Sequence, residues 1–213
     1  MPRAIKTAFW VVIFFLGAAS SAAAAGKTIL VYGDSLSAAY GIALDQGWVA
    51  LLGKRLAAEG DDYSVVNASI SGEITSGGLT RLPEALERYR PAILILELGA
   101  NDGLRGLPLA QMKANLDAMI REAQRAGARV LLVGIRMPPN YGPEYTERFA
   151  ATFADLARAR RVALVPFLLE GFAAREELFQ GDRMHPSAEA QPLMLENVWR
   201  PLAPLLGKKP RAR

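Results

Sequence analysis

Apolar and polar residues follow one another in blocks along this chain of 213 residues. Short apolar runs of the length of a buried strand are separated by longer stretches with a helical pattern. Strands of a parallel sheet are nearly continuous in apolar residues because both faces of the sheet are covered. The predicted strands are residues 28–32, 63–67, 92–98, 129–135 and 163–167.

The stretches between these strands carry apolar residues at every third or fourth position, which predicts amphipathic helices. Gly60 and Gly127 are typical C-terminal caps, and Pro83 lies inside the second helical pattern, near its predicted start. We expect a bend near Pro201 in the last helix. The predicted helices cover about 48–60, 79–86, 109–126, 144–160 and 188–206.

Strands that alternate with helices predict an α/β fold, with three layers and a central parallel sheet of about five strands. Residues 26–207 contain no linker, repeat or low-complexity tract, so one domain is the simplest interpretation. In such folds the active groups lie on loops after the carboxyl ends of strands. We therefore expect the catalytic residues on those loops and in the segment before the last helix.

Both ends of the chain differ from this domain. Residues 1–25 combine a basic start (Arg3 and Lys6), a short apolar run and a string of small residues, which is the order of a secretory signal peptide. An uncleaved membrane anchor is the alternative, but a spanning helix needs roughly 20 apolar residues. We expect a periplasmic or secreted protein. Residues 208–213 form a basic tail, interpreted as a solvated, frayed end rather than a contact to anionic lipid.

Composition excludes several classes of function. The net charge of +4 arises at the two ends, because without the two basic residues of the start and the four of the tail the body carries −2. The chain therefore offers no basic face for nucleic acid. It has no cysteine, which excludes disulfides, thiolate metal sites and a cysteine nucleophile.

Ser35 is the candidate nucleophile. It lies in Gly33-Asp34-Ser35-Leu36, after the first predicted strand, where a small residue allows a tight turn. The motif alone is weak, because a serine here is equally typical of a helix N-cap. Acyl transfer by a serine also needs a base, a group that orients the base, and donors for the oxyanion.

His185, the only histidine, is the candidate base because imidazole titrates near neutral pH. A lone histidine is more often structural, and Asp182 is alternatively a surface turn residue. However, Asp182 precedes His185 by three residues, so a single turn can bring its carboxylate to the imidazole. The predicted oxyanion donors are the N–H groups of Ser35 and Gly72 and the amide of Asn101, although Gly72 and Asn101 are also typical of plain loops.

Two apolar loops border this predicted site and are suited to an acyl chain. The alternative is that these side chains only pack the loops against the domain. The candidate substrate-binding residues are Leu104, Leu107, Pro108, Met137 and Tyr141.

Four blocks of the chain, taken in order, resemble the GDSL or SGNH hydrolase family. They are Gly33-Asp34-Ser35-Leu36, Gly72, Gly99-Ala100-Asn101-Asp102 and Asp182-Arg183-Met184-His185. The resemblance covers essentially the whole chain after residue 25. Residues 66–72, 97–106 and 139–142 are similar to the bacterial periplasmic thioesterases and lysophospholipases of that family.

The resemblance implies a flavodoxin-like fold, a triad of Ser35, Asp182 and His185, and hydrolysis of acyl esters and thioesters. It implies no metal, and we expect no cofactor. We expect a monomer whose partner is a small acyl ester or thioester, with no nucleic acid and with membrane contact only through a lipid substrate. Glu73-Ile74-Thr75-Ser76 departs from the more polar family sequence, which leaves the substrate preference open.

Three alternatives remain. A carbohydrate or cell-wall O-acetyl esterase would use the same site, although an acetyl pocket needs little apolar lining. A non-catalytic acyl-binding module would keep the fold without needing Ser35, Asp182 and His185 together. A phosphate-binding protein of the same fold would need a Gly-rich cradle after the first strand, which the sequence lacks.

Overall fold

The computed structural model describes Met1 and residues 27–208. Residues 2–25 of the predicted signal peptide and residues 209–213 of the tail lie outside the described residues. Within them, the strands form a five-stranded parallel sheet in the order β2-β1-β3-β4-β5. The strands are β1 (Lys27–Gly33), β2 (Tyr63–Asn67), β3 (Ile93–Glu97), β4 (Arg129–Val133) and β5 (Ala163–Val165), which confirms the predicted sheet.

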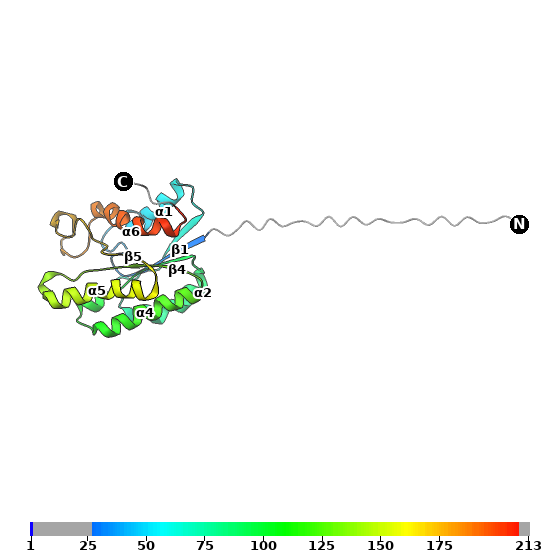
Figure 1. Ribbon diagram of the computed structural model, residues 1–213. Coiled ribbons are helices and arrows are strands. Elements are labelled where there is room, and N and C mark those ends of the chain that lie inside the picture. Colours follow the sequence, from blue (N-terminus) through cyan, green and yellow to red (C-terminus); the bar gives the residue numbers. More distant parts are fainter. Residues whose placement is uncertain (2–26, 209–213) are drawn as a thin grey trace.

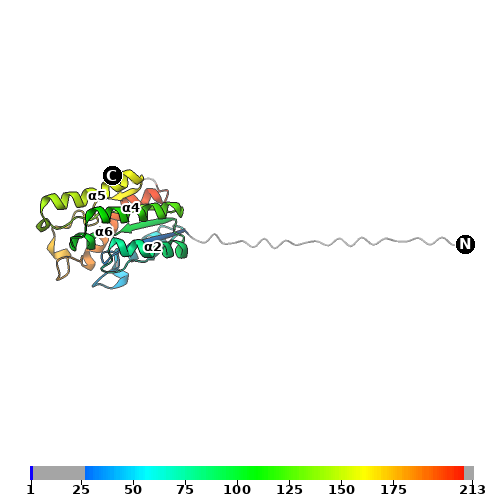
Figure 2. The ribbon, with the colours of Figure 1, turned by 90° about the horizontal axis from the view of Figure 1, so that it is seen from below.

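Helices cover both faces of the sheet (Figure 1). On one face α1 (Trp48–Ala58) packs beside α6 (Gln191–Leu205). The other face is covered by α2 (Thr75–Tyr89), α4 (Leu109–Arg125) and α5 (Pro143–Arg160), which lie side by side in Figure 2. The three layers and this strand order are those of a flavodoxin-like fold, as predicted. None of the described helices is long and apolar enough to span a bilayer.

The central strands are buried from both sides, which explains their apolar runs. Ile29, Leu30, Val31 and Tyr32 of β1 have no exposed surface, and every residue of β3 is buried. β2 lies at the edge of the sheet and is half-buried. One buried residue of β3 is not apolar, namely Glu97 at its carboxyl end.

Two local features differ from the sequence pattern. A short helix, α3 (Ala100–Leu104), replaces the turn expected after β3. α2 begins at Thr75, several residues before the predicted start, and Pro83 lies in its interior. The two glycines before Leu79 hid this start, because glycine has a low helix propensity. Gly78 has a packing reason: Leu98 fills the space where a side chain would lie, and the Gly78 carbonyl accepts a hydrogen bond from the Tyr32 hydroxyl.

The first residue of the basic tail is held rather than frayed. Lys208 forms ion pairs with Glu59 and with Asp61 (2.5 Å), and its Nζ lies 5.0 Å from the centre of the Trp199 ring. The interpretation as a frayed end is therefore wrong for Lys208, because its ammonium group forms ion pairs with acidic residues that follow α1.

Leu96→Ala tests the contribution of β3 to stability. Leu96 is fully buried, so the substitution leaves a cavity, and we expect the free energy of unfolding to fall by about 2–5 kcal/mol in urea titrations. Leu193→Ala is the control, because Leu193 on α6 is 38% exposed and its loss should change little. Equal effects of the two substitutions would contradict the layered core.

Candidate active site

Ser35 lies in a turn directly after β1. Asp34 builds this turn, because its carbonyl accepts the N–H of Ala38 (3.0 Å) and its Oδ1 accepts the N–H of Leu36 (3.0 Å). The next α-helix is α1, and its N-cap is Gly47. The alternative interpretation of Ser35 as a helix N-cap is therefore wrong, and its hydroxyl is available for other contacts.

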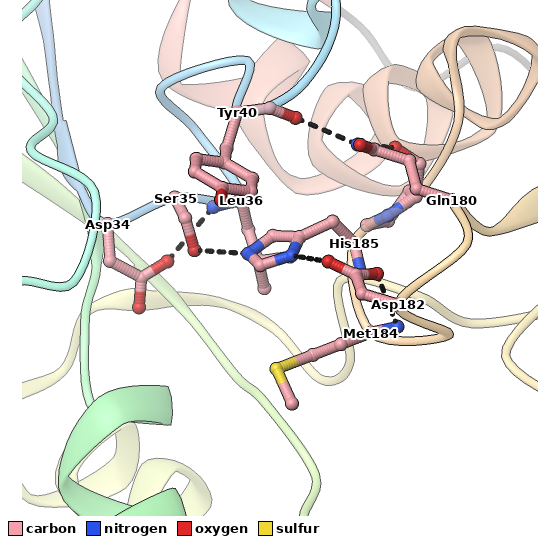
Figure 3. A network of polar contacts seen from close by, with 9 residues as sticks. Asp34, Ser35, Leu36, Tyr40, Gln180, Asp182, Met184 and His185 are labelled. Carbon is pink, nitrogen blue, oxygen red and sulfur yellow. Dashed lines mark hydrogen bonds and ion pairs between the residues drawn. The ribbon is translucent and has the colours of Figure 1, made fainter.

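Ser35, His185 and Asp182 form one chain of hydrogen bonds (Figure 3). Ser35 Oγ lies 2.9 Å from His185 Nε2, and His185 Nδ1 lies 2.6 Å from Asp182 Oδ2. Asp182 Oδ1 accepts the N–H groups of Met184 (2.9 Å) and His185 (3.0 Å). The loop thus wraps around the carboxylate and aims its other oxygen at the imidazole.

The Asp182 carboxylate is stabilised in its charged form. The N–H of His185 and then its imidazole, both donating to Asp182, lower the pKa of this carboxyl to about 2. The side chain is 42% exposed, so water also solvates the charge. Asp182 therefore stays ionised near neutral pH, and its charge can stabilise an imidazolium.

Tyr40 and Gln180 fix the position of His185, and sequence analysis missed both. The Tyr40 ring packs against the imidazole with ring centres 4.5 Å apart. Gln180 donates its N–H to the His185 carbonyl (2.8 Å), and its Nε2 donates to the carbonyls of Tyr40 (2.8 Å) and Pro186 (3.1 Å). Neither residue belongs to a periodic pattern, so the sequence carries no signal for these contacts.

The loop after β2 brings Gly72 to Ser35. The N–H of Ile70 donates to the Gly33 carbonyl (3.0 Å), and Arg105 Nη2 donates to the Gly72 carbonyl (2.9 Å). Gly72 has φ of +79°, which favours glycine. Among the hydrogen bonds between described residues, the N–H groups of Ser35 and Gly72 have no protein acceptor. Both residues border the same cavity, so both groups are free to bind an oxyanion there.

Asn101 borders that cavity too, but its amide is already engaged. Its Nδ2 donates to Asp34 Oδ2 (3.1 Å) and to the Glu73 carbonyl (3.0 Å). An amide nitrogen has two hydrogens, so donation to an oxyanion requires that one of them be shared. The next residue, Asp102, is buried and accepts the N–H of Thr75 (2.8 Å), which ties α3 to the start of α2.

A cavity of about 960 Å³ opens beside the Ser35 hydroxyl. Leu104 and Met137, two of the predicted substrate-binding residues, line it. Its wall is largely apolar and comes from the loops that follow β3, β4 and β5. Further lining residues are Ile135, Pro138, Pro139, Phe167, Leu169 and Phe179.

Leu107, Pro108 and Tyr141, also predicted to bind substrate, lie outside the lining of this cavity. Leu107 and Pro108 form the turn into α4, where Pro108 is the N-cap. The Tyr141 hydroxyl donates to the Leu104 carbonyl (3.1 Å) and so links two loops. Apolar composition identified loops that border the cavity, but it does not tell which side chains face the cavity.

The profile of the GDSL-like lipase/acylhydrolase family matches residues 31–192, more than half of the chain. The chain belongs to this family. It is 55% identical over 183 residues to esterase TesA of Pseudomonas aeruginosa, covering 86% of this chain and 91% of that protein. It is 40% identical over 184 residues to thioesterase 1/protease 1/lysophospholipase L1 of Escherichia coli K12, covering 86% and 87%.

The fold agrees with that assignment. A crystal structure of TesA matches with a TM-score of 0.83 at 54% identity, covering 84% of this chain and 99% of that one. The protein is therefore an ester hydrolase of the GDSL type, with the three-layer fold of that family.

The first residue of the GDSL motif is a glycine for a steric reason. A Cβ on Gly33 would lie 2.6 Å from Glu97 Oε2 and 2.8 Å from Ser37 Oγ. The Glu97 carboxyl accepts the Ser37 hydroxyl at 2.7 Å, so Gly33, Ser37 and Glu97 share one compact space beside the turn that carries Ser35. Sequence analysis missed Glu97, although an acidic residue within the apolar run 92–98 is a signal that could have found it.

Gly33→Ala should therefore lower both stability and esterase activity. We expect a loss of about 1–3 kcal/mol in the free energy of unfolding, because the added methyl displaces Glu97 or Ser37. Gly53→Ala is the control: it lies in α1, its nearest neighbour would be Val65 at 4.0 Å, and alanine there is neutral or stabilising. Wild-type stability and activity in Gly33→Ala would contradict the close approach.

Proposed function

We propose that this GDSL hydrolase cleaves acyl esters and thioesters through an acyl-enzyme, with Ser35 as nucleophile, His185 as general base and Asp182 as the group that orients the base. The observation that carries the proposal is the hydrogen-bonded chain from Ser35 Oγ through His185 to Asp182, which meets a large apolar cavity at Ser35. A nucleophile, a base and an orienting carboxylate in this order are the requirements of acyl transfer by serine.

In the first half-reaction His185 Nε2 takes the proton of Ser35 Oγ as the oxygen attacks the acyl carbonyl. The imidazolium then donates from Nδ1 to Asp182, which remains ionised. The N–H groups of Ser35 and Gly72 and the amide of Asn101 donate to the oxyanion. Each such donor typically contributes about 2.7–4 kcal/mol to lowering the barrier. The tetrahedral intermediate collapses as His185 gives its proton to the leaving alcohol or thiol.

In the second half-reaction His185 takes a proton from water, and the resulting hydroxide attacks the acyl group on Ser35. The same donors hold the second oxyanion. Collapse returns the proton from His185 to Ser35 Oγ and releases the carboxylic acid. The low pKa of Asp182 supports a role in orientation and charge stabilisation rather than proton transfer.

The cavity supports a substrate with an extended acyl chain. Its volume of about 960 Å³ lies at the upper end of small-molecule sites, and an acetyl group would leave most of it unfilled. This favours acyl esters and thioesters over the alternative of a carbohydrate O-acetyl esterase. The alternative of a non-catalytic acyl-binding module gives no reason for the aligned Ser35, His185 and Asp182.

We also propose that the protein works after export, in the periplasm or outside the cell, as a monomer. The supporting observation is the order of basic, apolar and small residues in positions 1–25. N-terminal sequencing of the exported protein tests this proposal, and a start at Met1 would contradict cleavage.

Ser35→Ala and His185→Ala should each lower kcat for a p-nitrophenyl ester by about 10⁴-fold or more, because either change removes a group that acts in the reaction itself. Asp182→Ala should lose less, since water can partly replace a carboxylate that is 42% exposed. Labelling by a fluorophosphonate should be absent in Ser35→Ala. Wild-type rates in either of the first two variants would refute the triad.

The cavity predicts a dependence on chain length. Met137→Gln should lower kcat/KM for octanoyl esters and thioesters by about tenfold while leaving acetyl esters nearly unchanged, because it places a polar group in an apolar wall. Leu107→Gln is the matched control, since Leu107 lies outside the cavity lining. An equal effect of Met137→Gln on acetyl and octanoyl substrates, or a larger effect of Leu107→Gln, would contradict this assignment of the acyl site.

A further inference from the structure

Two carboxyl groups lie buried beneath the nucleophile and take no part in the mechanism above. Asp34 and Glu97 have no exposed surface. Asp34 Oδ1 and Oδ2 accept N–H groups from Leu36 (3.0 Å) and Asn101 (3.1 Å). Glu97 Oε2 accepts the Ser37 hydroxyl (2.7 Å) and, at 3.3 Å, the N–H of Asp34. Among the described residues, Glu97 Oε1 has no hydrogen-bond partner.

Within the described part of the chain, neither Asp34 nor Glu97 forms an ion pair with a lysine or an arginine that would balance its charge. The ionisable groups that face Asp34 are His185 on the last loop and Asp102 on α3, while Asp34 itself faces Glu97. Two unbalanced charges in a buried site are far more costly than one, so one carboxyl keeps its proton.

The hydrogen-bond partners of Asp34 and Glu97 indicate which of the two carboxyls keeps the proton. Asp34 receives one N–H donor on each of its oxygens, which is the environment of a carboxylate. Glu97 has one hydroxyl donor, one long contact, and an Oε1 that accepts nothing. We propose that Glu97 is a neutral carboxylic acid in the working enzyme and acts as a positioning residue, because its proton leaves the single negative charge on Asp34, which holds Asn101 at the oxyanion hole.

The direction of the pKa values agrees with this assignment. Burial raises the pKa of Glu97 well above its usual range, and the negative charge of Asp34 raises it further. Burial raises the pKa of Asp34 to only about 6, because the N–H of Leu36 opposes the effect of burial. Of the two carboxyls, Asp34 is therefore the one that ionises first as the pH rises.

The location of this proton matters for Asn101. A carboxylate accepts hydrogen bonds at both oxygens, whereas a protonated Asp34 would carry a donor on one of them. If Glu97 released its proton to Asp34, the contact between Asp34 and the Asn101 amide would weaken. This consequence rests on the proposed function, in which Asn101 stabilises the oxyanion, but the protonation of Glu97 does not.

Infrared spectroscopy at pH 7 measures the proton directly. The wild type should show the carbonyl stretch of an un-ionised carboxylic acid, and Glu97→Gln should lack that intensity. Glu84→Gln is the matched control, because Glu84 is an exposed residue of α2 and its loss should leave the band in place. A wild-type spectrum that equals that of Glu97→Gln in this region would overturn the proposal, whatever the activity of either protein.

Stability gives a second measurement, with a definite sign. The pKa of Glu97 is higher in the folded than in the unfolded protein, where it is about 4.3. The free energy of unfolding of the wild type therefore has its full contribution from Glu97 below about pH 4.3 and loses it as the pH rises toward the pKa of the folded state. Glu97→Gln lacks this decline. The Tm of the variant minus that of the wild type should therefore increase from pH 4 to pH 7, by about 3–5 °C for each tenfold difference in proton affinity. A difference that is constant or falls would overturn the proposal.

Activity then separates positioning from simple packing. Glu97→Gln keeps a neutral polar side chain that can accept from Ser37, so kcat and the acid limb of its pH profile should remain near wild type. Glu97→Leu removes the acceptor of the Ser37 hydroxyl and the Asp34 N–H and leaves Asp34 in more apolar surroundings, which raises the pKa of Asp34. The acid limb should therefore move to higher pH, and kcat should fall by up to about 10²-fold with little change in KM.

The activity outcomes can be told apart from failure of the proposed function. A Glu97→Gln acid limb that moves to lower pH would mean that a negative charge was removed beside Asp34, which would overturn the neutral acid. Equal kcat in Glu97→Leu and the wild type would overturn positioning through Asn101. If Ser35→Ala were active, the proposed function would fail, while the infrared band and the Tm trend would still decide the state of Glu97.

Discussion

The hydrogen bond between Ser35 Oγ and His185 Nε2 joins two loops that are 150 residues apart in the chain, and the proposed mechanism depends on it. A bond of this length tolerates little movement of either loop. One partner is fixed by the turn that Asp34 builds after β1, and the other by Asp182, Gln180 and the Tyr40 ring. Both loops lie at the carboxyl edge of one buried sheet, so the rigid core sets their separation.

The fold was largely predictable from periodicity, whereas the site was predictable only in part. Strands such as β3 are buried on both faces, and the sequence therefore shows them as apolar runs. Ser35, Asp182 and His185 could be proposed because chemistry restricts which residue types can serve. The Tyr40 ring and the Gln180 amide could not, because their roles arise from tertiary contacts that leave no mark in local spacing.

The cavity proposed to hold the acyl chain shows a second limit of sequence-based prediction. Leu104 and Leu107 are three residues apart and equally apolar, yet only Leu104 lines the cavity. The difference arises because α3 ends at Leu104 and the chain then turns toward α4, with the Leu107 N–H bonded to the Asp102 carbonyl. Composition identifies an apolar loop, but the backbone direction decides which side chain reaches a ligand.

The negative charge of the buried carboxyl pair lies next to the proposed oxyanion hole, because Asp34 accepts a hydrogen bond from the Asn101 amide. A preorganised donor must be held before the reaction, since reorienting it during the reaction would forfeit much of its benefit. The Asn101 amide is held by Asp34 and by the Glu73 carbonyl, and the loop that carries Glu73 is itself tied to α3 through Asp102. In the proposed protonation state, a single negative charge on Asp34 polarises that amide, and a neutral Glu97 adds no second charge that would repel the oxyanion. A carboxyl pair that shares one proton would therefore suit the proposed site, in which negative charge forms close to buried carboxyls.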